Sequence, residues 1–171
     1  GDGAAMGRMA AEHFMNLGLK NFAFYGASGI TQSAERCDGF VAALRRSGYN
    51  ASIMEAPSRD VMLFSAKIVE RTRRRLKGLS KPIGIFVWRD LEGRFLLEAS
   101  MAAGIKVPNE AAVVAVNNDR HICETSVPPM SSVALDLDGP VEQALLLLNR
   151  IMRKEEKMAG QRIIIRPSHI V

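Results

Sequence analysis

The sequence predicts an α/β fold: a doubly wound, mostly parallel sheet of five strands in a three-layer α-β-α arrangement. Two observations support this prediction. Short runs rich in β-branched and aromatic residues alternate along the chain with longer segments whose apolar residues recur every three or four positions. Two of the short runs, 83–87 and 113–116, are followed at once by polar residues, as expected at the carboxyl ends of buried parallel strands.

The elements can be assigned in order from these patterns. The predicted strands are 21–26, 51–56, 83–87, 113–116 and 132–135, with a last strand at 162–166. The predicted helices are 4–17, 33–47, 59–77, 90–103, 120–125 and 139–154. Asp2 and Asp90 are expected to be helix N-caps, because their carboxylates accept from backbone N–H groups of a first turn. Leu17 and Phe64 are expected on buried helix faces.

Five strands separated by helices favour right-handed crossovers and the strand order 2-1-3-4-5. In that order, ligands bind in the crevice between the carboxyl ends of strands one and three. These ends are the loop that carries Ser28 and the tip Trp88–Asp90. Topology alone therefore points to this edge of the sheet.

Composition limits the class of protein. The chain has 171 residues, 47% of them hydrophobic, and no apolar run approaches the roughly 20 residues of a membrane span. We find no secretory signal, and the two cysteines form no CxxC pair, so we expect a cytoplasmic protein without a zinc site. The basic run at 71–77 is interpreted as the solvated last turn of a helix rather than a nucleic-acid patch. Since the chain begins without Met, we expect it to belong to a longer protein.

Three enzyme-like sites are disfavoured. The turn at 26–31 lacks the third glycine of a dinucleotide fingerprint, and Glu55 lies too far along the chain. A phosphoacceptor site would need carboxylates at the end of the first strand, where none occurs. His13, His121 and His169 are scattered, so no catalytic triad or metal site is predicted.

A sugar or polyol site fits the strand tips better. Sugar hydroxyls are bound by planar groups that make paired hydrogen bonds, namely carboxylates, amides and guanidinium groups. Groups of this kind occur at the predicted crevice in Asp2, Arg36, Arg89, Asp90, Asn117 and Asn118. Trp88 is positioned to stack on the apolar face of a sugar ring. Structural roles as caps, turn residues or surface cations remain the alternative for each of these residues.

Several motifs give the chain a family resemblance. They are DGAAMG at 2–7, ERCDGF at 35–40, VWRD at 87–90, VVAVNN at 113–118 and PPMSSV at 128–133. In this order they resemble the effector-binding domain of the lac-repressor (LacI/GalR) family and, within it, the xylose operon regulators (XylR type). The resemblance implies one lobe of a type I periplasmic-binding-protein-like fold.

The resemblance also implies site residues. Asp2, Arg36, Arg89 and Asn117 match ligand contacts of the family, and Ser28, Trp88, Asp90 and Asp136 are secondary candidates. Two positions depart from the family pattern, which usually has Asn at the position of Arg89 and Asp at that of Asn117. The bulky Arg89 is expected to fill part of the crevice or to favour an acidic effector. D-xylose is a plausible effector.

The implied function is that of a sugar-sensing domain in a transcriptional regulator, without a cofactor, a metal or enzyme activity. Its expected partners are a small sugar, operator DNA bound through a domain outside this chain, and a second copy in a homodimer. Residues 1–135 are expected to form the C-terminal lobe, 136–160 a crossover and a helix of the other lobe, and 161–171 a return strand. The alternatives are a solute-binding protein of a sugar transporter and a nucleotide-dependent enzyme.

Overall fold

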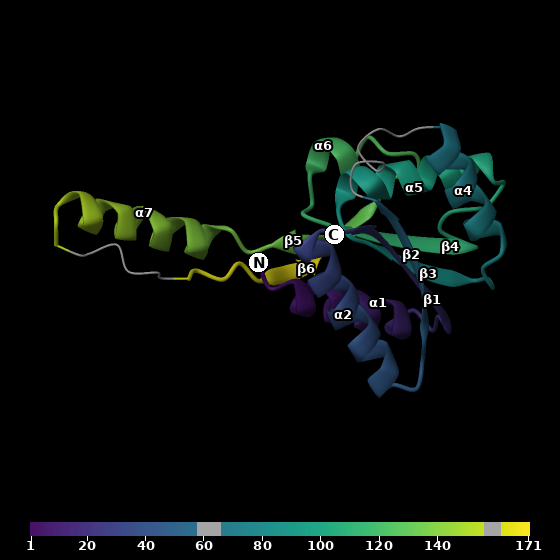
Figure 1. Ribbon diagram of the computed structural model, residues 1–171, viewed down its shortest axis with the longest axis horizontal. Coiled ribbons are helices and arrows are strands. Elements are labelled where there is room, and N and C mark those ends of the chain that lie inside the picture. Colours follow the sequence, from purple (N-terminus) through teal and green to yellow (C-terminus); the bar gives the residue numbers. More distant parts are fainter. Residues whose placement is uncertain (58–65, 156–161) are drawn as a thin grey trace.

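The computed structural model describes residues 1–57, 66–155 and 162–171 and shows one six-stranded sheet in the order β2-β1-β3-β4-β5-β6 (Figure 1). The first five strands pair in parallel, and β6 runs antiparallel to β5. The predicted order 2-1-3-4-5 is therefore confirmed. The strands are β1 (Asn21–Ser28), β2 (Ala51–Pro57), β3 (Ile83–Val87), β4 (Ala111–Val116), β5 (Ser131–Leu135) and β6 (Pro167–Ile170).

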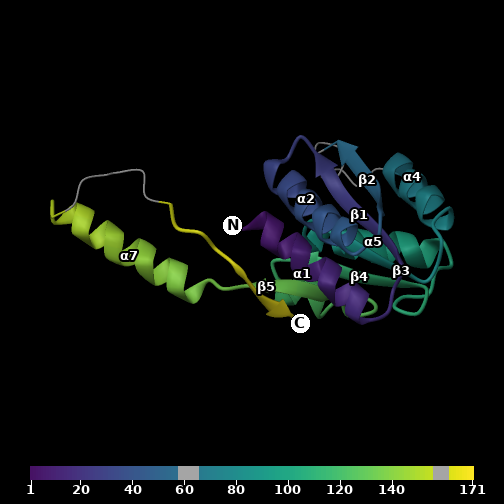
Figure 2. The same ribbon diagram turned by 90° about the horizontal axis from the view of Figure 1, so that it is seen from below.

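Helices cover both faces of the sheet, as predicted (Figure 2). One face packs against α1 and α2 and the other against α4, α5 and α6, which gives three layers. The described helices are α1 (Gly3–Asn16), α2 (Thr31–Arg46), α4 (Ala66–Lys77), α5 (Asp90–Ala102), α6 (Arg120–Cys123) and α7 (Asp138–Met152). None of them is both long and apolar enough to cross a membrane.

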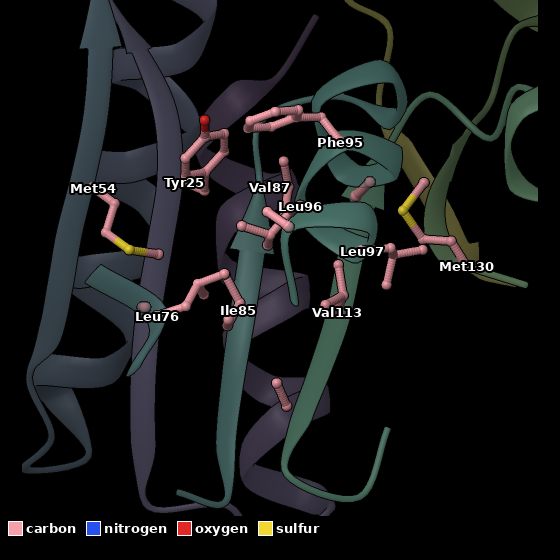
Figure 3. Close-up of a cluster of buried hydrophobic side chains, with 14 of the residues drawn as sticks. Tyr25, Met54, Leu76, Ile85, Val87, Phe95, Leu96, Leu97, Val113 and Met130 are labelled. Carbon is pink, nitrogen blue, oxygen red and sulfur yellow. The ribbon is translucent and has the colours of Figure 1, made fainter. Parts of the chain in front are cut away.

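The α4/α5 side of the core is formed by mostly aliphatic side chains from the strands and from the helices that cover them, together with Tyr25 and Phe95 (Figure 3). Ile85 and Val87 of β3 face this side, and Leu96 of α5 packs over them, all fully buried. The uninterrupted IGIFV run is explained by this position, because a central parallel strand is buried on both faces. Phe86, between those two residues, belongs to the cluster on the other face.

Glycines bring α1 and α2 into close contact. A Cβ on Gly7 would lie 2.2 Å from the carbonyl oxygen of Arg36, and one on Gly39 would lie 2.2 Å from that of Ala4. Neither position therefore accepts a side chain without moving the helices apart. This packing holds the first half of α2, and with it Arg36, over the carboxyl edge of the sheet.

Four sequence predictions require correction or fall outside the described residues. The last strand is Pro167–Ile170 rather than 162–166, because its pairing with β5 decides its position. Leu17 is exposed, since α1 ends at Asn16 and Phe14 takes the core position instead. The N-cap of α5 is Arg89, and Asp90 is the first helical residue. Phe64 lies outside the described residues.

The helix α7 stands away from the three-layer body (Figures 1 and 2). It follows β5 outward, and the segment 162–166 runs back toward the body before β6 pairs with β5. None of the residues of α7 is buried. The body from α1 to β5 therefore forms its core without this helix.

Candidate ligand site at the carboxyl edge of the sheet

Four predicted site residues meet where the parallel strands end. Arg36 comes from the second turn of α2, Trp88 and Arg89 follow β3, and Asn117 follows β4. Because β1, β3 and β4 are neighbouring parallel strands, their carboxyl ends open on the same edge of the sheet. Residues from α2 and from the tips after β3 and β4 are thus brought to the edge of the sheet that topology predicted.

Arg36 connects two of these tips. Its Nη1 donates to the carbonyl oxygen of Trp88, and its Nη2 donates to Oδ1 of Asn117 at 3.4 Å. The residue is only 8% exposed, and burial lowers the pKa of its guanidinium, while the Asp90 and Glu35 carboxylates act in the opposite direction. A guanidinium held in this way has a fixed orientation for hydrogen bonding.

Hydrogen-bond donors are in surplus at this place. Nε of Arg36 and Nε1 of Trp88 are both buried and have no acceptor among the described residues. A buried donor without an acceptor costs about 1–3 kcal/mol. Both atoms have almost no exposed surface, so in this conformation the protein encloses them and only the neighbouring Asn117 amide is open to a ligand.

The tip after β4 adopts an unusual backbone conformation. Asn117 and Asn118 have φ angles of 113° and 54°, in the left-handed region that asparagine tolerates better than most residues. The N–H of Asn117 donates to the Val133 carbonyl at 3.1 Å, and the N–H of Asn118 donates to Oγ of Ser132 at 3.0 Å. These bonds from β5 hold the exposed Asn117 amide in place at the edge.

The Asp90 side chain also stabilises the tip after β4. One carboxylate oxygen accepts from Oγ of Ser132 at 2.6 Å and the other from the N–H of Asp119 at 2.8 Å. Burial raises the pKa of this carboxyl, and hydrogen bonds from Ser132, Asp119 and Cys123 act against that shift. With 2% of its surface exposed, Asp90 faces the protein rather than the crevice, so the structure gives it a positioning role.

Arg89 turns back onto its own helix. Its Nε and Nη2 donate to the two carboxylate oxygens of Glu92 at 2.6 and 2.7 Å, and its guanidinium lies 4.4 Å from the centre of the Trp88 ring. The hydrogen bond to Glu92 raises the pKa of Arg89. The ring face that we assigned to a sugar is therefore covered by a cation–π contact.

Glu92 is the residue that the sequence analysis missed. Its side chain is fully buried although it lies in the first turn of α5, two residues after the buried Asp90. The Arg-x-x-Glu spacing was a usable signal, because residues three apart are neighbours on a helix. The spacing of the apolar residues in α5 did not predict that the side of the helix carrying Glu92 is buried.

Three predicted contacts lie apart from the Arg36 group. Ser28 borders a hollow that is lined by 27–31, Ala34 and Glu55. Asp136 is exposed and lines a second hollow together with Gln143 of α7 and Arg166. Asp2 caps α1 as predicted, accepting from the N–H of Ala5 at 2.9 Å, and its own N–H donates to the Ile165 carbonyl at 2.8 Å.

The described part of the chain offers neither a metal-binding cluster nor a reactive thiol. It contains no group of three or more His, Cys, Asp and Glu side chains placed to hold a metal ion. Both cysteines are free thiols, and burial raises the pKa of Cys37 to about 11 and that of Cys123 to about 12. Among the described residues, neither thiol is poised as a nucleophile.

Comparison with known proteins places this geometry in a family. Residues 11–171 match the model of the periplasmic binding protein-like domain, and the chain belongs to that family. A xylose operon regulatory protein of Haemophilus influenzae is 31% identical over 97% of the chain and 43% of its own length. The HTH-type transcriptional regulator DegA of Bacillus subtilis is 25% identical over 96% of the chain and 48% of its own length.

Solved structures agree with this assignment. The structure of the xylose-binding transcription activator xylR superposes with a TM-score of 0.84 at 27% identity, covering 99% of this chain and 45% of the other. The chain thus spans less than half the length of these relatives. The relatives named here are regulators of transcription, as the resemblance in the sequence implied.

Proposed function

We propose that this chain is the effector-sensing lobe of a sugar-responsive transcriptional regulator. The observation that carries the proposal is Arg36, which joins the tips of β3 and β4 beside further buried donors. Such a wall offers the exposed Asn117 amide to sugar hydroxyls, and Arg36 holds that amide in position. Regulators among the relatives, including a xylose-binding activator, support this function over that of a transporter component or an enzyme.

The proposed mechanism is closure of two lobes on the ligand. Residues 1–135 supply one wall, 136–160 lead into the other lobe with α7, and 161–171 are the return segment, which contains β6. This path of the chain between the two lobes is compatible with the structure, in which the chain leaves β5 toward α7 and β6 pairs beside β5. A ligand that binds the closed form more tightly shifts the population of DNA-binding states through a domain outside this chain.

Calorimetry on the full-length regulator tests the proposal with D-xylose, L-arabinose and D-ribose. Arg36→Ala removes a charge-assisted donor and should weaken binding of the effector by about tenfold or more. Arg45→Ala is the matched control, because it removes an exposed arginine in the last turn of the same helix. Equal affinity in the two variants would remove Arg36 from the site, and micromolar binding of NAD(P) instead of sugars would refute the function.

A further inference from the structure

The Arg89–Glu92 pair bears on which chemical class of effector the site accepts. Arg89 stands at the crevice and, by itself, would favour an acidic ligand. Glu92 changes this, because its buried carboxylate holds the guanidinium through two short hydrogen bonds. The positive charge of Arg89 is thereby balanced within the protein.

The second cation of the site is occupied within the protein as well. Arg36 is buried, which lowers the pKa of its guanidinium, and the carboxylates of Asp90 and Glu35 act against that shift. An added carboxylate on the ligand would meet one guanidinium already paired with Glu92 and a second one, that of Arg36, which already donates to the Trp88 carbonyl and the Asn117 amide, and it would have to lose its own hydration to do so. A hydroxyl group needs only a donor, and Arg89 retains one, since its Nη1 has no partner among the described residues.

The position of Arg89 is fixed from two sides. Glu92 holds the edge formed by Nε and Nη2, and the Trp88 ring lies beneath its plane at 4.4 Å. The side chain remains 33% exposed, so it is held at the surface of the carboxyl edge of the sheet. A guanidinium that is both fixed and charge-balanced is a donor for neutral oxygen atoms.

We infer that Glu92 determines ligand class: by pairing with Arg89 it makes the site select neutral sugars over the corresponding sugar acids. The inference rests on the proposed function, since it concerns the ligand of the same site. It also identifies Glu92 as a positioning residue, acting on the ligand through Arg89.

The effect of a carboxylate on binding can be measured with two pairs of sugars that differ only in that group. D-Glucuronate has the ring of D-xylose with a carboxylate added at C5, and D-galacturonate is related to L-arabinose in the same way. Calorimetry on the full-length regulator should show that the unmodified protein binds the neutral member of a pair at least tenfold more tightly. Glu92→Gln, which leaves Arg89 charged and unbalanced, should shift the ratio of affinities toward the uronate by about tenfold or more.

Glu98→Gln is the matched control. It removes the same charge from the same helix, but Glu98 is exposed and pairs with Arg94 on the solvent side of α5. Fluorescence of this chain gives a readout that needs no ligand. Trp88 is its only tryptophan, and the Arg89 guanidinium stacks on the Trp88 ring. Glu92→Gln should change the Trp88 emission, and Glu98→Gln should leave it unchanged.

The outcomes separate the inference from the proposed function. Tighter binding of a uronate than of its neutral partner by the unmodified protein would overturn the inference and leave sugar sensing intact. An unchanged ratio or an unchanged Trp88 emission in folded Glu92→Gln would also overturn it. If no sugar of either class binds, the proposed function fails and the inference with it. If the variant does not fold, the unmodified protein can still overturn the inference by binding a uronate more tightly than its neutral partner.

Discussion

The three-layer body and α7 both carry leucine side chains, but in opposite environments. In the body, side chains such as Leu96 and Phe86 are fully buried between the sheet and its helices. In α7, Leu145, Leu146 and Leu148 are more than half exposed. An apolar helix without a buried residue has no core of its own, so we infer that its packing partner lies outside the body.

The largest expected difference between the two regions concerns stability. Leu96→Ala should lower the free energy of unfolding of this chain by about 2–5 kcal/mol, because it leaves a cavity beneath α5. Leu146→Ala, a matched change at a residue that is 54% exposed, should change it by less than about 0.5 kcal/mol. Urea unfolding measures both, and similar losses would show that α7 is packed in the isolated chain.

A second difference is expected in association. The exposed leucines of α7 should cause this chain to pair with a second copy, or to exchange α7 with it, because contiguous apolar surface favours burial. Substituting Leu145, Leu146 and Leu148 together by Gln should restore a monomer, while the same change at the isolated exposed Leu17 should have no effect. Light scattering that shows a strict monomer of the unmodified chain at high concentration would contradict this.

The smallest expected effect concerns the thiols. With a pKa of about 11, only ~0.1% of Cys37 is thiolate at pH 8, and Cys123, with a pKa of about 12, ionises still less. Both should react with a disulfide reagent far more slowly in the folded chain than in urea. Leu17→Cys provides the contrast, since a thiol at this isolated exposed position should react at once. Fast labelling of Cys123 in the folded chain would show that α6 opens.

Much of the sheet was predictable because its strands are continuous apolar runs ended by polar residues. The 83–87 strand and the tips at Arg89 and Asn117 follow from local sequence alone. The position of β6 does not, because 162–166 has the stronger strand composition, whereas PSHI pairs only through Val133 and Leu135 of β5. The position of β6 is therefore set by its pairing with β5, which lies more than 30 residues earlier in the sequence.

The residues that meet at the candidate site were predictable, but their partners were not. Arg36, Arg89 and Asn117 were chosen as candidates by residue type and by position near the strand ends, and the structure brings them to one edge of the sheet. That Arg89 binds Glu92 rather than pointing freely into the crevice depends on the burial of the first turn of α5, which also takes Asp90 inward. The spacing of apolar residues predicts which face of a helix is buried. In α5 the polar residues Asp90 and Glu92, which do not belong to that apolar pattern, are buried as well.

The most direct test of the account compares effector binding by this chain and by the full-length regulator. If the carboxyl edge of the sheet is one wall of a two-lobed cleft, calorimetry with the sugar that the full-length protein binds best should show at least about a hundredfold weaker binding to this chain, because half of the contacts are lost. Equal affinity in the two proteins would contradict the account, since it would place the whole site within this lobe.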